Sequence, residues 1–203
     1  VTLRGLEEPY VKRTVEGDLG MRYSAASLIE AVGLQNMSNY VPKGIKEEDI
    51  KNYVEKVTKN VKHIPENELE KEIDYGIAKA AVNLAVKRHV GRIETVYGPF
   101  GISYVQYGKD LTKLDLIIGT GGVLVHSDNP GEILRFGLYE DKSPEVLAPM
   151  WPEMLLDKEY ILSSVGLLSE VAPDKALLLA KKHLKEVKFQ GGKSWKLKIK
   201  RGA

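Results

Sequence analysis

The chain has 203 residues, a formal net charge of +2 and no cysteine. Hydrophobic residues make up 43% and charged residues 29%, as in ordinary globular proteins, and no apolar run approaches the roughly 18 residues of a membrane-spanning helix. The lack of cysteine excludes disulfides, zinc ribbons, thiolate catalysis and iron–sulfur clusters, and the small net charge argues against a nucleic-acid partner. No signal-peptide pattern opens the sequence, so we expect a cytoplasmic protein that binds no membrane.

The first predicted elements are mainly helical. Residues 1–15 are loosely extended, and a glycine-punctuated turn follows at Glu16–Gly20. A helix is predicted over Tyr23–Val32, and apolar residues at helical spacing predict a second one between Ile45 and Val61. The third and longest covers Glu66–His89, and its alanine-rich middle predicts close approach of a neighbouring element.

The pattern then changes to strands. Ile93–Tyr97 and Ile102–Tyr107 are β-rich runs joined by a turn at Gly98-Pro99. Leu114–Ile118 ends in uniformly apolar residues, which predicts a strand buried on both faces. A short strand is expected at Val123–Val125. The second half is therefore predicted to be built around a sheet.

Helices return toward the end of the chain. One is expected to begin at Pro130, and two more are expected over Asp157–Val171 and Pro173–Val187, before a closing strand at Trp195–Ile199. A cluster of basic residues in this region indicates a solvated face or a protected edge strand. Its members are Lys181, Lys182, Lys185, Lys188, Lys193, Lys196, Lys198, Lys200 and Arg201. The chain as a whole is predicted to be mixed α/β.

The glycine loop, defined here as Gly119-Thr120-Gly121-Gly122, is the most informative motif, and Val123 follows it directly. Glycines after a buried strand leave backbone N–H groups uncovered at the carboxyl end of that strand, where ligands bind in open α/β sheets. The loop is not a dinucleotide fingerprint, since Leu124 occupies the position of the third glycine, and no P-loop motif occurs in the chain. The pattern alone leaves ligand binding and a tight structural turn as alternatives.

The glycine turn, Glu16–Gly20, is the second motif. Gly17, Asp18 and Gly20 precede a predicted helix, whose amino terminus favours an anion. In the alternative interpretation Asp18 caps the turn and Arg22 pairs with Glu16 or Asp18 on the surface.

Other catalytic or metal-binding patterns are not evident. The four histidines show no ligand spacing, so each is expected to be a surface or helix-end residue; they are His63, His89, His126 and His183. Four acidic residues on the third predicted helix are expected to form a solvated face; they are Glu68, Glu70, Glu72 and Asp74. No G-x-S-x-G elbow occurs. We therefore predict no catalytic residue and no metal ligand in this chain.

Taken together, several motifs resemble the MutL family associated with glutamate mutase (GlmL), which is distinct from the mismatch-repair protein of the same name. The resemblance extends from about Glu8 to Leu184. It is carried by the segments Lys12–Arg22, Arg88–Glu94, Gly108–Thr112, Ile118–Leu124, Asp157–Leu162 and Gly166–Leu168.

This family is similar to the actin and heat-shock-chaperone ATPase superfamily, in which ATP lies between two lobes. The resemblance implies an α/β, actin-like (ribonuclease-H-like) lobe with a helix-rich inserted subdomain, incomplete in this chain. Residues 1–22 and 90–203 would form the sheet-centred part, and residues 23–89 the helical part. The glycine loop and Val123 would bind the adenosine.

By the same resemblance, Gly17, Asp18 and Gly20 match a glycine turn that leads into the helical subdomain. A basic residue of that subdomain commonly faces the adenine, and Lys79, Lys87 and Arg88 are the candidates. The resemblance leaves the choice among these three open.

The two phosphate-binding hairpins that hold Mg-ATP in this superfamily are expected to precede Val1. Since the sequence begins with Val1 rather than Met, we expect the chain to be a piece of a longer polypeptide, whose amino-terminal half is itself a partner. Hydrolysis requires the γ-phosphate, its metal and the attacking water to be positioned together. We therefore expect the isolated chain to bind ATP or ADP with magnesium weakly or not at all, and not to hydrolyse ATP.

The family implies that the whole protein is an accessory factor that reactivates an adenosylcobalamin-dependent mutase, either glutamate mutase or an aminomutase. No residue here indicates contact with cobalamin. Two further hypotheses remain: a non-catalytic protein-interaction module with a structural glycine loop, and an NAD-type oxidoreductase, which the missing third glycine disfavours.

Overall fold

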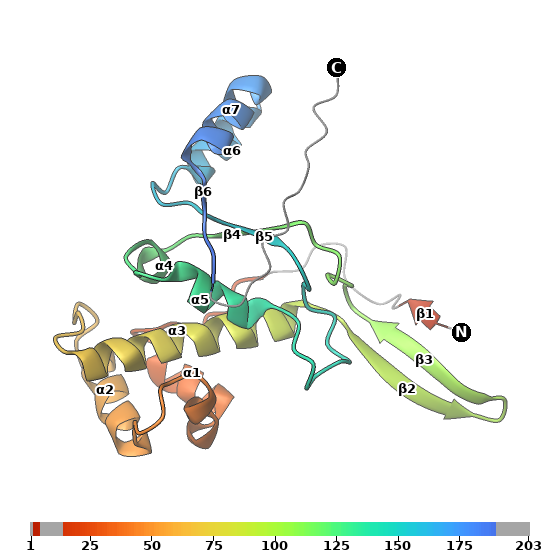
Figure 1. Cartoon of the computed structure of the whole chain (residues 1–203), viewed down its shortest axis with the longest axis horizontal. Coiled ribbons are helices and arrows are strands. Elements are labelled where there is room, and N and C mark those ends of the chain that lie inside the picture. Colours follow the sequence, from red (N-terminus) through yellow and green to blue (C-terminus); the bar gives the residue numbers. More distant parts are fainter. Residues whose placement is uncertain (1, 5–13, 190–203) are drawn as a thin grey trace. The chain divides into compact units, whose positions relative to one another are not determined.

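The computed structural model of the chain describes residues 2–4 and 14–189 (Figure 1). It divides into two compact units. The first unit is drawn from residues 1–112 and 133–150, and the second unit from residues 113–132 and 151–203. Helices and small sheets occur in the chain, so the mixed α/β class is confirmed. The domain boundaries implied by the family resemblance stay a prediction.

The core of the first unit is helical, as the apolar spacing predicted. It contains α1 (Ala25–Val32), η1 (Leu34–Asn39), α2 (Glu47–Lys59) and α3 (Glu68–His89). Helix α2 begins with three acidic residues, and α3 ends with Lys87, Arg88 and His89, so both complement the helix dipole. The largest fully buried side chains of this core are Leu28, Met37, Ile50, Val57, Ile73 and Ile77.

Close approach in the middle of α3, predicted from its small residues, is confirmed at Gly76. A Cβ atom there would lie 2.4 Å from Cγ1 of Val41 and 3.3 Å from the carbonyl oxygen of Tyr40. Only glycine lets the segment that follows η1 pass this close to the helix.

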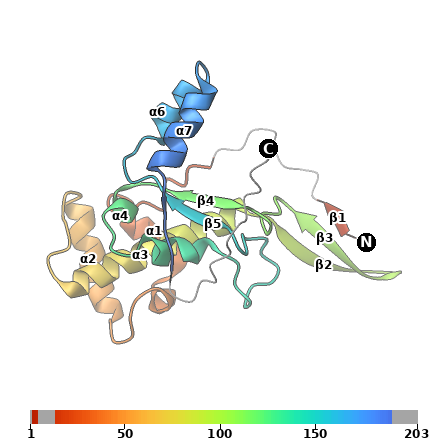
Figure 2. The same ribbon diagram turned by 45° about the horizontal axis from the view of Figure 1, so that its top comes forward.

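The predicted hairpin is also present. Strand β2 (Arg92–Gly98) pairs antiparallel with β3 (Gly101–Tyr107), and β1 (Thr2–Arg4) pairs parallel with β3. Gly98 lies opposite Gly101, whose φ of +106° belongs to the region that favours glycine. In both views the ribbon of β2 and β3 continues beyond the end of α3 (Figures 1 and 2).

A later segment returns to this unit through η2 (Arg135–Gly137). Asn83 of α3 joins it to the helical core, because its Nδ2 donates to the carbonyl oxygen of Phe136 at 2.7 Å and its Oδ1 accepts from the Tyr40 hydroxyl at 3.0 Å. Further along, Val146 forms a β-bridge with Arg92.

The second unit contains a sheet in the order β4-β5-β6, formed by β4 (Leu116–Gly119), β5 (Glu153–Leu156) and β6 (Lys185–Glu186). Strand β4 is parallel to β5, and β6 is antiparallel to β5. The sequence predicted β4 but not β5 or β6. The apolar run of β5 is too short to identify a strand by periodicity.

The short helices of this half are α4 (Gly122–Val125) and α5 (Pro130–Leu134). Two longer helices, α6 (Leu162–Ser169) and α7 (Pro173–His183), lie side by side in both views (Figures 1 and 2). Both were predicted, but α6 begins five residues later than expected and α7 ends before β6. The closing strand predicted at Trp195–Ile199 lies outside the described residues.

None of the helices in the described ranges combines the length and apolar character needed to cross a bilayer.

Candidate functional site

The glycine loop lies at the carboxyl end of β4, beside the carboxyl end of β5. Gly119 is paired with Leu156, and the N–H of Asp157 donates to the carbonyl oxygen of Gly119 at 2.9 Å. Two parallel strands therefore end side by side, and the loops that follow them, 120–121 and 157–161, face the same edge of the sheet. This edge is the position that the sequence predicted for a ligand.

Burial of β4 on both faces was not a correct prediction. Leu116 is 38% exposed and Ile118 is 37% exposed. These two residues are two positions apart and therefore share one face of the strand, so that face is only partly covered. In the sheet of the described residues β4 also has a neighbour, β5, on one side only. The uniformly apolar run identified the strand correctly but overestimated its burial.

The loop itself is open. Gly121 has a φ of +106°, and no atom lies within 4 Å of the position that its Cβ would take. Thr120 and Gly122 are exposed, whereas Gly119 is buried beneath the loop. A planar group can therefore approach the backbone closely on the side of Gly121, where a side chain would otherwise stand.

The strand predicted at Val123–Val125 is wrong, because the chain enters the single helical turn of α4. The N–H groups of Leu124 and Val125 both donate to the carbonyl oxygen of Gly121, at 3.1 and 3.0 Å. The left-handed conformation of Gly121 turns the chain into α4, and Leu124 is buried by that turn. An apolar run of three residues fits a strand or a buried helical turn equally well.

The loop that follows β5 is held by a buried carboxylate. Asp157 is buried, and its two oxygens accept from the N–H groups of Ile161 at 3.0 Å and Leu162 at 3.1 Å. These bonds set the beginning of α6, which is why the predicted helix does not start at Asp157. The carboxylate is thus engaged by its own loop.

Tyr160 lies in the loop that follows β5, near the glycine loop. It has a φ of +55°, an unfavourable conformation for an aromatic residue, and its ring is half exposed. Its hydroxyl oxygen lies 3.9 Å from the position that a Cβ of Gly122 would take. Backbone strain of this kind is concentrated at functional sites, and sequence reasoning missed Tyr160 because only the strand pairing brings it to the glycine loop.

The glycine turn belongs to the first unit, and Arg88 binds its acidic side chains. The N–H of Leu19 donates to the carbonyl oxygen of Glu16 at 3.3 Å. Nη1 of Arg88 donates to Glu16 at 2.8 Å and to Asp18 at 2.9 Å. Arg88, one of the three candidates for the adenine contact, is therefore bound to the turn in which Gly17, Asp18 and Gly20 were singled out.

The surface pair predicted for Arg22 is wrong. Its two guanidinium nitrogens donate to the two carboxylate oxygens of Asp74, at 2.6 and 3.2 Å. The hydroxyl of Tyr53 donates to the same carboxylate at 2.8 Å. Burial, and then the charge of Asp74, raises the pKa of the Tyr53 hydroxyl well above its usual range. Asp74 is thus a buried residue that joins α2, α3 and the segment after the glycine turn, and its prediction as part of a solvated face is wrong.

The other two adenine candidates also have partners within the first unit. Nζ of Lys79 lies 5.9 Å from the ring centroid of Phe136 and 3.5 Å from the carbonyl oxygen of Tyr40. Nζ of Lys87 lies 3.5 Å from a carboxylate oxygen of Glu140.

His63 was expected at the surface or a helix end, but it is buried. It follows α2 and lies against Glu66 and Glu70, a grouping described below. Among the C-terminal basic residues that the structure describes, the expectation of a solvated face is confirmed for Lys181, Lys182, Lys185 and Lys188.

Comparison with known proteins gives a consistent result. The family described as MutL protein matches residues 1–184. The chain is 50% identical over 187 residues to Protein MutL of Clostridium tetanomorphum. That match covers 92% of this chain and 40% of the relative, so the chain spans about two fifths of the length of the curated relative it matches. No solved structure matches the chain.

Proposed function

The chain belongs to the MutL protein family, and from that premise we propose that it is the nucleoside-binding part of an ATPase-like accessory protein for an adenosylcobalamin-dependent mutase. The mutase would be glutamate mutase or an aminomutase. The nucleotide would be ATP or ADP with magnesium, and the fold would be an incomplete actin-like lobe.

The observation that supports nucleotide binding most directly is the pairing of β4 with β5. It sets the glycine loop and the loop of Asp157 and Tyr160 at one edge of a parallel pair, where open α/β sheets bind ligands. Sequence patterning alone left the loop as a possible structural turn. The positive φ of Tyr160, whose hydroxyl lies near Gly122, favours ligand binding over a turn with no other role.

The residues present fit the nucleoside rather than the phosphates. Gly121 leaves the backbone accessible to a flat base or ribose, Thr120 offers an exposed hydroxyl, and Tyr160 offers an exposed ring and hydroxyl. Asp157 is poorly placed to bind a magnesium ion, because it is buried and both of its carboxylate oxygens already accept backbone hydrogen bonds. Bound ATP would supply the phosphoryl group for hydrolysis, and this chain would bind and orient its adenosine.

The function of the whole protein would be mechanical. Closure of a two-lobed cleft on ATP and its opening after hydrolysis, a hinge motion, would open the mutase and release damaged cobalamin. This chain would contribute adenosine affinity to that cycle, and the phosphate-binding hairpins would come from the rest of the polypeptide.

The test is a pair of Mg-ATP titrations, on this chain and on a version extended upstream by its natural sequence. We expect binding and hydrolysis in the extended protein, and weak or no binding without hydrolysis in the isolated chain. Gly121→Val, which adds a strained Cβ to the open face of the loop, should abolish binding in the extended protein, whereas Gly166→Ala in α6 should not. Steady hydrolysis by the isolated chain that Gly121→Val abolishes would refute the divided site.

Hydrogen exchange identifies the ligand class. In the extended protein, adenine nucleotides with magnesium should protect the amides around Gly119, and NAD should not. Protection by NAD alone would indicate an oxidoreductase and contradict the proposal.

A second function, docking of a partner protein, is favoured by the exposed apolar side chains of α6 and α7. Leu167 of α6 and Leu178 of α7 are largely exposed, as is Val171 in the turn between these two packed helices. Single apolar residues at a surface are common, whereas exposed apolar side chains that form one contiguous patch mark interaction sites. Absence of nucleotide binding in both titrations would favour this function, with the glycine loop serving as a structural turn.

A further inference from the structure

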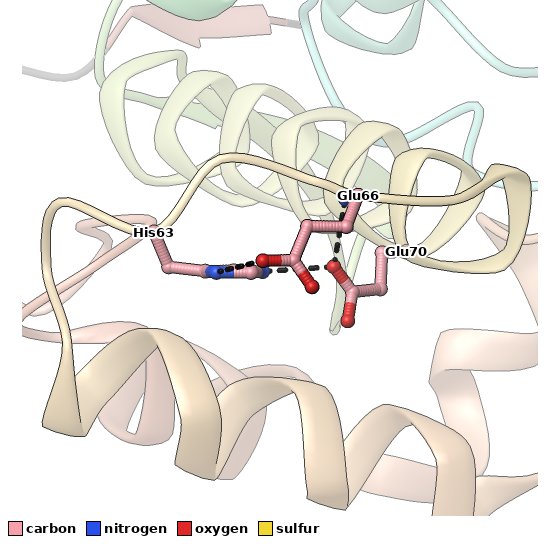
Figure 3. A group of neighbouring side chains, drawn as sticks. All are labelled: His63, Glu66 and Glu70. Atoms are coloured by element: carbon pink, nitrogen blue, oxygen red, sulfur yellow. Dashed lines mark hydrogen bonds and ion pairs between the residues drawn. The ribbon is translucent and has the colours of Figure 1, made fainter.

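His63, Glu66 and Glu70 converge where the connection between α2 and α3 enters the first turn of α3 (Figure 3). One possible ligand atom from each of the three side chains lies within 4.8 Å of the other two. Figure 3 shows both carboxylates turned toward the edge of the imidazole ring. Imidazole nitrogens and carboxylate oxygens are ordinary ligands of Zn²⁺. The buried imidazole of His63 therefore distinguishes this group from a purely acidic surface cluster.

Two of the three side chains are held in place before any ion binds. The His63 side chain is only 5% exposed, its backbone N–H donates to Asn60, and its ring meets that of Tyr53 edge-on at 6.1 Å. One carboxylate oxygen of Glu70 accepts from Nε2 of His63 at 2.8 Å and from the N–H of Glu66 at 3.0 Å. The imidazole and the second carboxylate are thus preorganised.

Glu66 is the adjustable member. Its side chain is 70% exposed, and its Oε1 lies 4.0 Å from Nδ1 of His63. Two atoms bound to one ion at about 2.1 Å cannot be more than about 4.2 Å apart. The 4.0 Å separation is measured to Nδ1, whereas Glu70 lies against Nε2, and one imidazole binds an ion through one of its two nitrogens. With one atom taken from each residue, the separations within the group reach up to 4.8 Å, so binding requires the exposed Glu66 side chain to rotate toward the ion.

The ammonium group of Lys56 already binds the two carboxylates of this group. Its Nζ lies 2.8 Å from Oε1 of Glu70 and 3.2 Å from Oε2 of Glu66, so one ammonium group bridges the two carboxylates. Lys56 is partly exposed on a flexible stem, and its head group can move into water. A divalent ion would match the two negative charges that the single ammonium only half neutralises.

We propose that His63, Glu66 and Glu70 bind a divalent transition-metal ion, of which Zn²⁺ is the probe, and that the ion displaces the ammonium of Lys56. One nitrogen and two oxygen ligands suit Zn²⁺ better than Ca²⁺ or Mg²⁺, which take oxygen ligands. Water completes the coordination. The ion cross-links the end of the α2–α3 connection to α3 and stabilises the helical core of the first unit.

The experiment titrates the EDTA-treated chain with ZnCl₂ by calorimetry and measures thermal unfolding with and without the ion. We expect one saturable site per chain and a higher melting temperature with Zn²⁺. Glu66→Gln and Glu70→Gln should each weaken binding by at least about tenfold, since even outer partners of zinc ligands contribute that much. Glu66→Gln alters an exposed side chain, so its folding is safe even where a change at buried His63 disrupts the core.

Two further variants make the test specific. Glu68→Gln removes the same charge from the same turn of α3, but the Glu68 side chain is 82% exposed and pairs with Lys71, so zinc affinity should not change. Lys56→Met removes the competing ammonium and should strengthen zinc binding. No saturable binding, equal affinity in the Glu66→Gln, Glu70→Gln and Glu68→Gln variants, or weaker binding in Lys56→Met would each overturn the proposal.

Discussion

Replacement of Asp74 by alanine should cost the first unit a large part of its stability. The carboxylate accepts from Arg22 at 2.6 Å and from Tyr53 at 2.8 Å. Removing one partner of a buried ion pair costs about 3–5 kcal/mol, and the 29% exposure of Arg22 places its share at the lower end, because water can reach the guanidinium. The buried Tyr53 hydroxyl loses its acceptor, which adds about 1 kcal/mol. We expect a loss of about 3–4 kcal/mol.

The assay is urea unfolding followed by the far-ultraviolet circular dichroism of the helices, together with hydrogen exchange of α3 amides to isolate the first unit. Glu68→Ala on the same helix is the matched control, with an expected cost below about 1 kcal/mol. In a Tyr53→Phe background the cost of Asp74→Ala should fall by about 1 kcal/mol, the part that belongs to the hydroxyl. If Asp74→Ala and Glu68→Ala cost the same, the buried network is not the stabilising element described here.

Two further predictions concern stability. Gly76→Ala should destabilise the chain by about 1–3 kcal/mol through overpacking against Val41. Gly166→Ala adds a Cβ that meets no atom within 4 Å inside α6 and should stabilise the chain by about 0.5–1 kcal/mol. Equal effects of the two substitutions in urea unfolding would contradict the close approach at Gly76. The hydrogen bond from Lys56 lowers the pKa of Glu70 from 4.5 to about 2, so the stability contributed by Glu70 is present above pH 4.5 and lost as the pH falls toward 2. In the Glu70→Gln variant the free energy of unfolding should change less as the pH falls from 4.5 toward 2. An unchanged pH dependence would contradict the assignment to Glu70.

The sequence predicted the helices of the first unit because their patterns are long. Helix α3 repeats its apolar spacing over six turns, and the β2–β3 hairpin is marked by Gly98-Pro99. Strand β5 and the helical turn α4 are four residues each, too short to show a period. The family was also predicted correctly, because several weak motifs occurred in one order along the chain.

The partners of charged side chains could not be predicted in the same way. Asp74 resembles its solvated neighbours in the sequence, yet it faces Arg22, which is 52 residues away. His63 has no ligand at the spacings of known motifs, and its burial depends on the packing of α2 against α3. Periodicity shows which face of a helix is apolar, but it carries no information about which polar residue on a boundary is covered.

These long-range pairs also change what the glycine turn can do. Asp74 and Arg88 are fourteen residues apart on α3, about 21 Å along the helix axis, and both hold the segment from Glu16 to Arg22. That segment is therefore fixed along α3 at two points, and the carboxylate of Asp18 is already paired with Arg88, which it shares with Glu16. An effect of Asp18 on nucleotide affinity would then act through the position of the turn and of Arg88 together. The glycine turn and Arg88, one of the three candidates for the adenine contact, form one structural unit, and a substitution at either position is expected to disturb both.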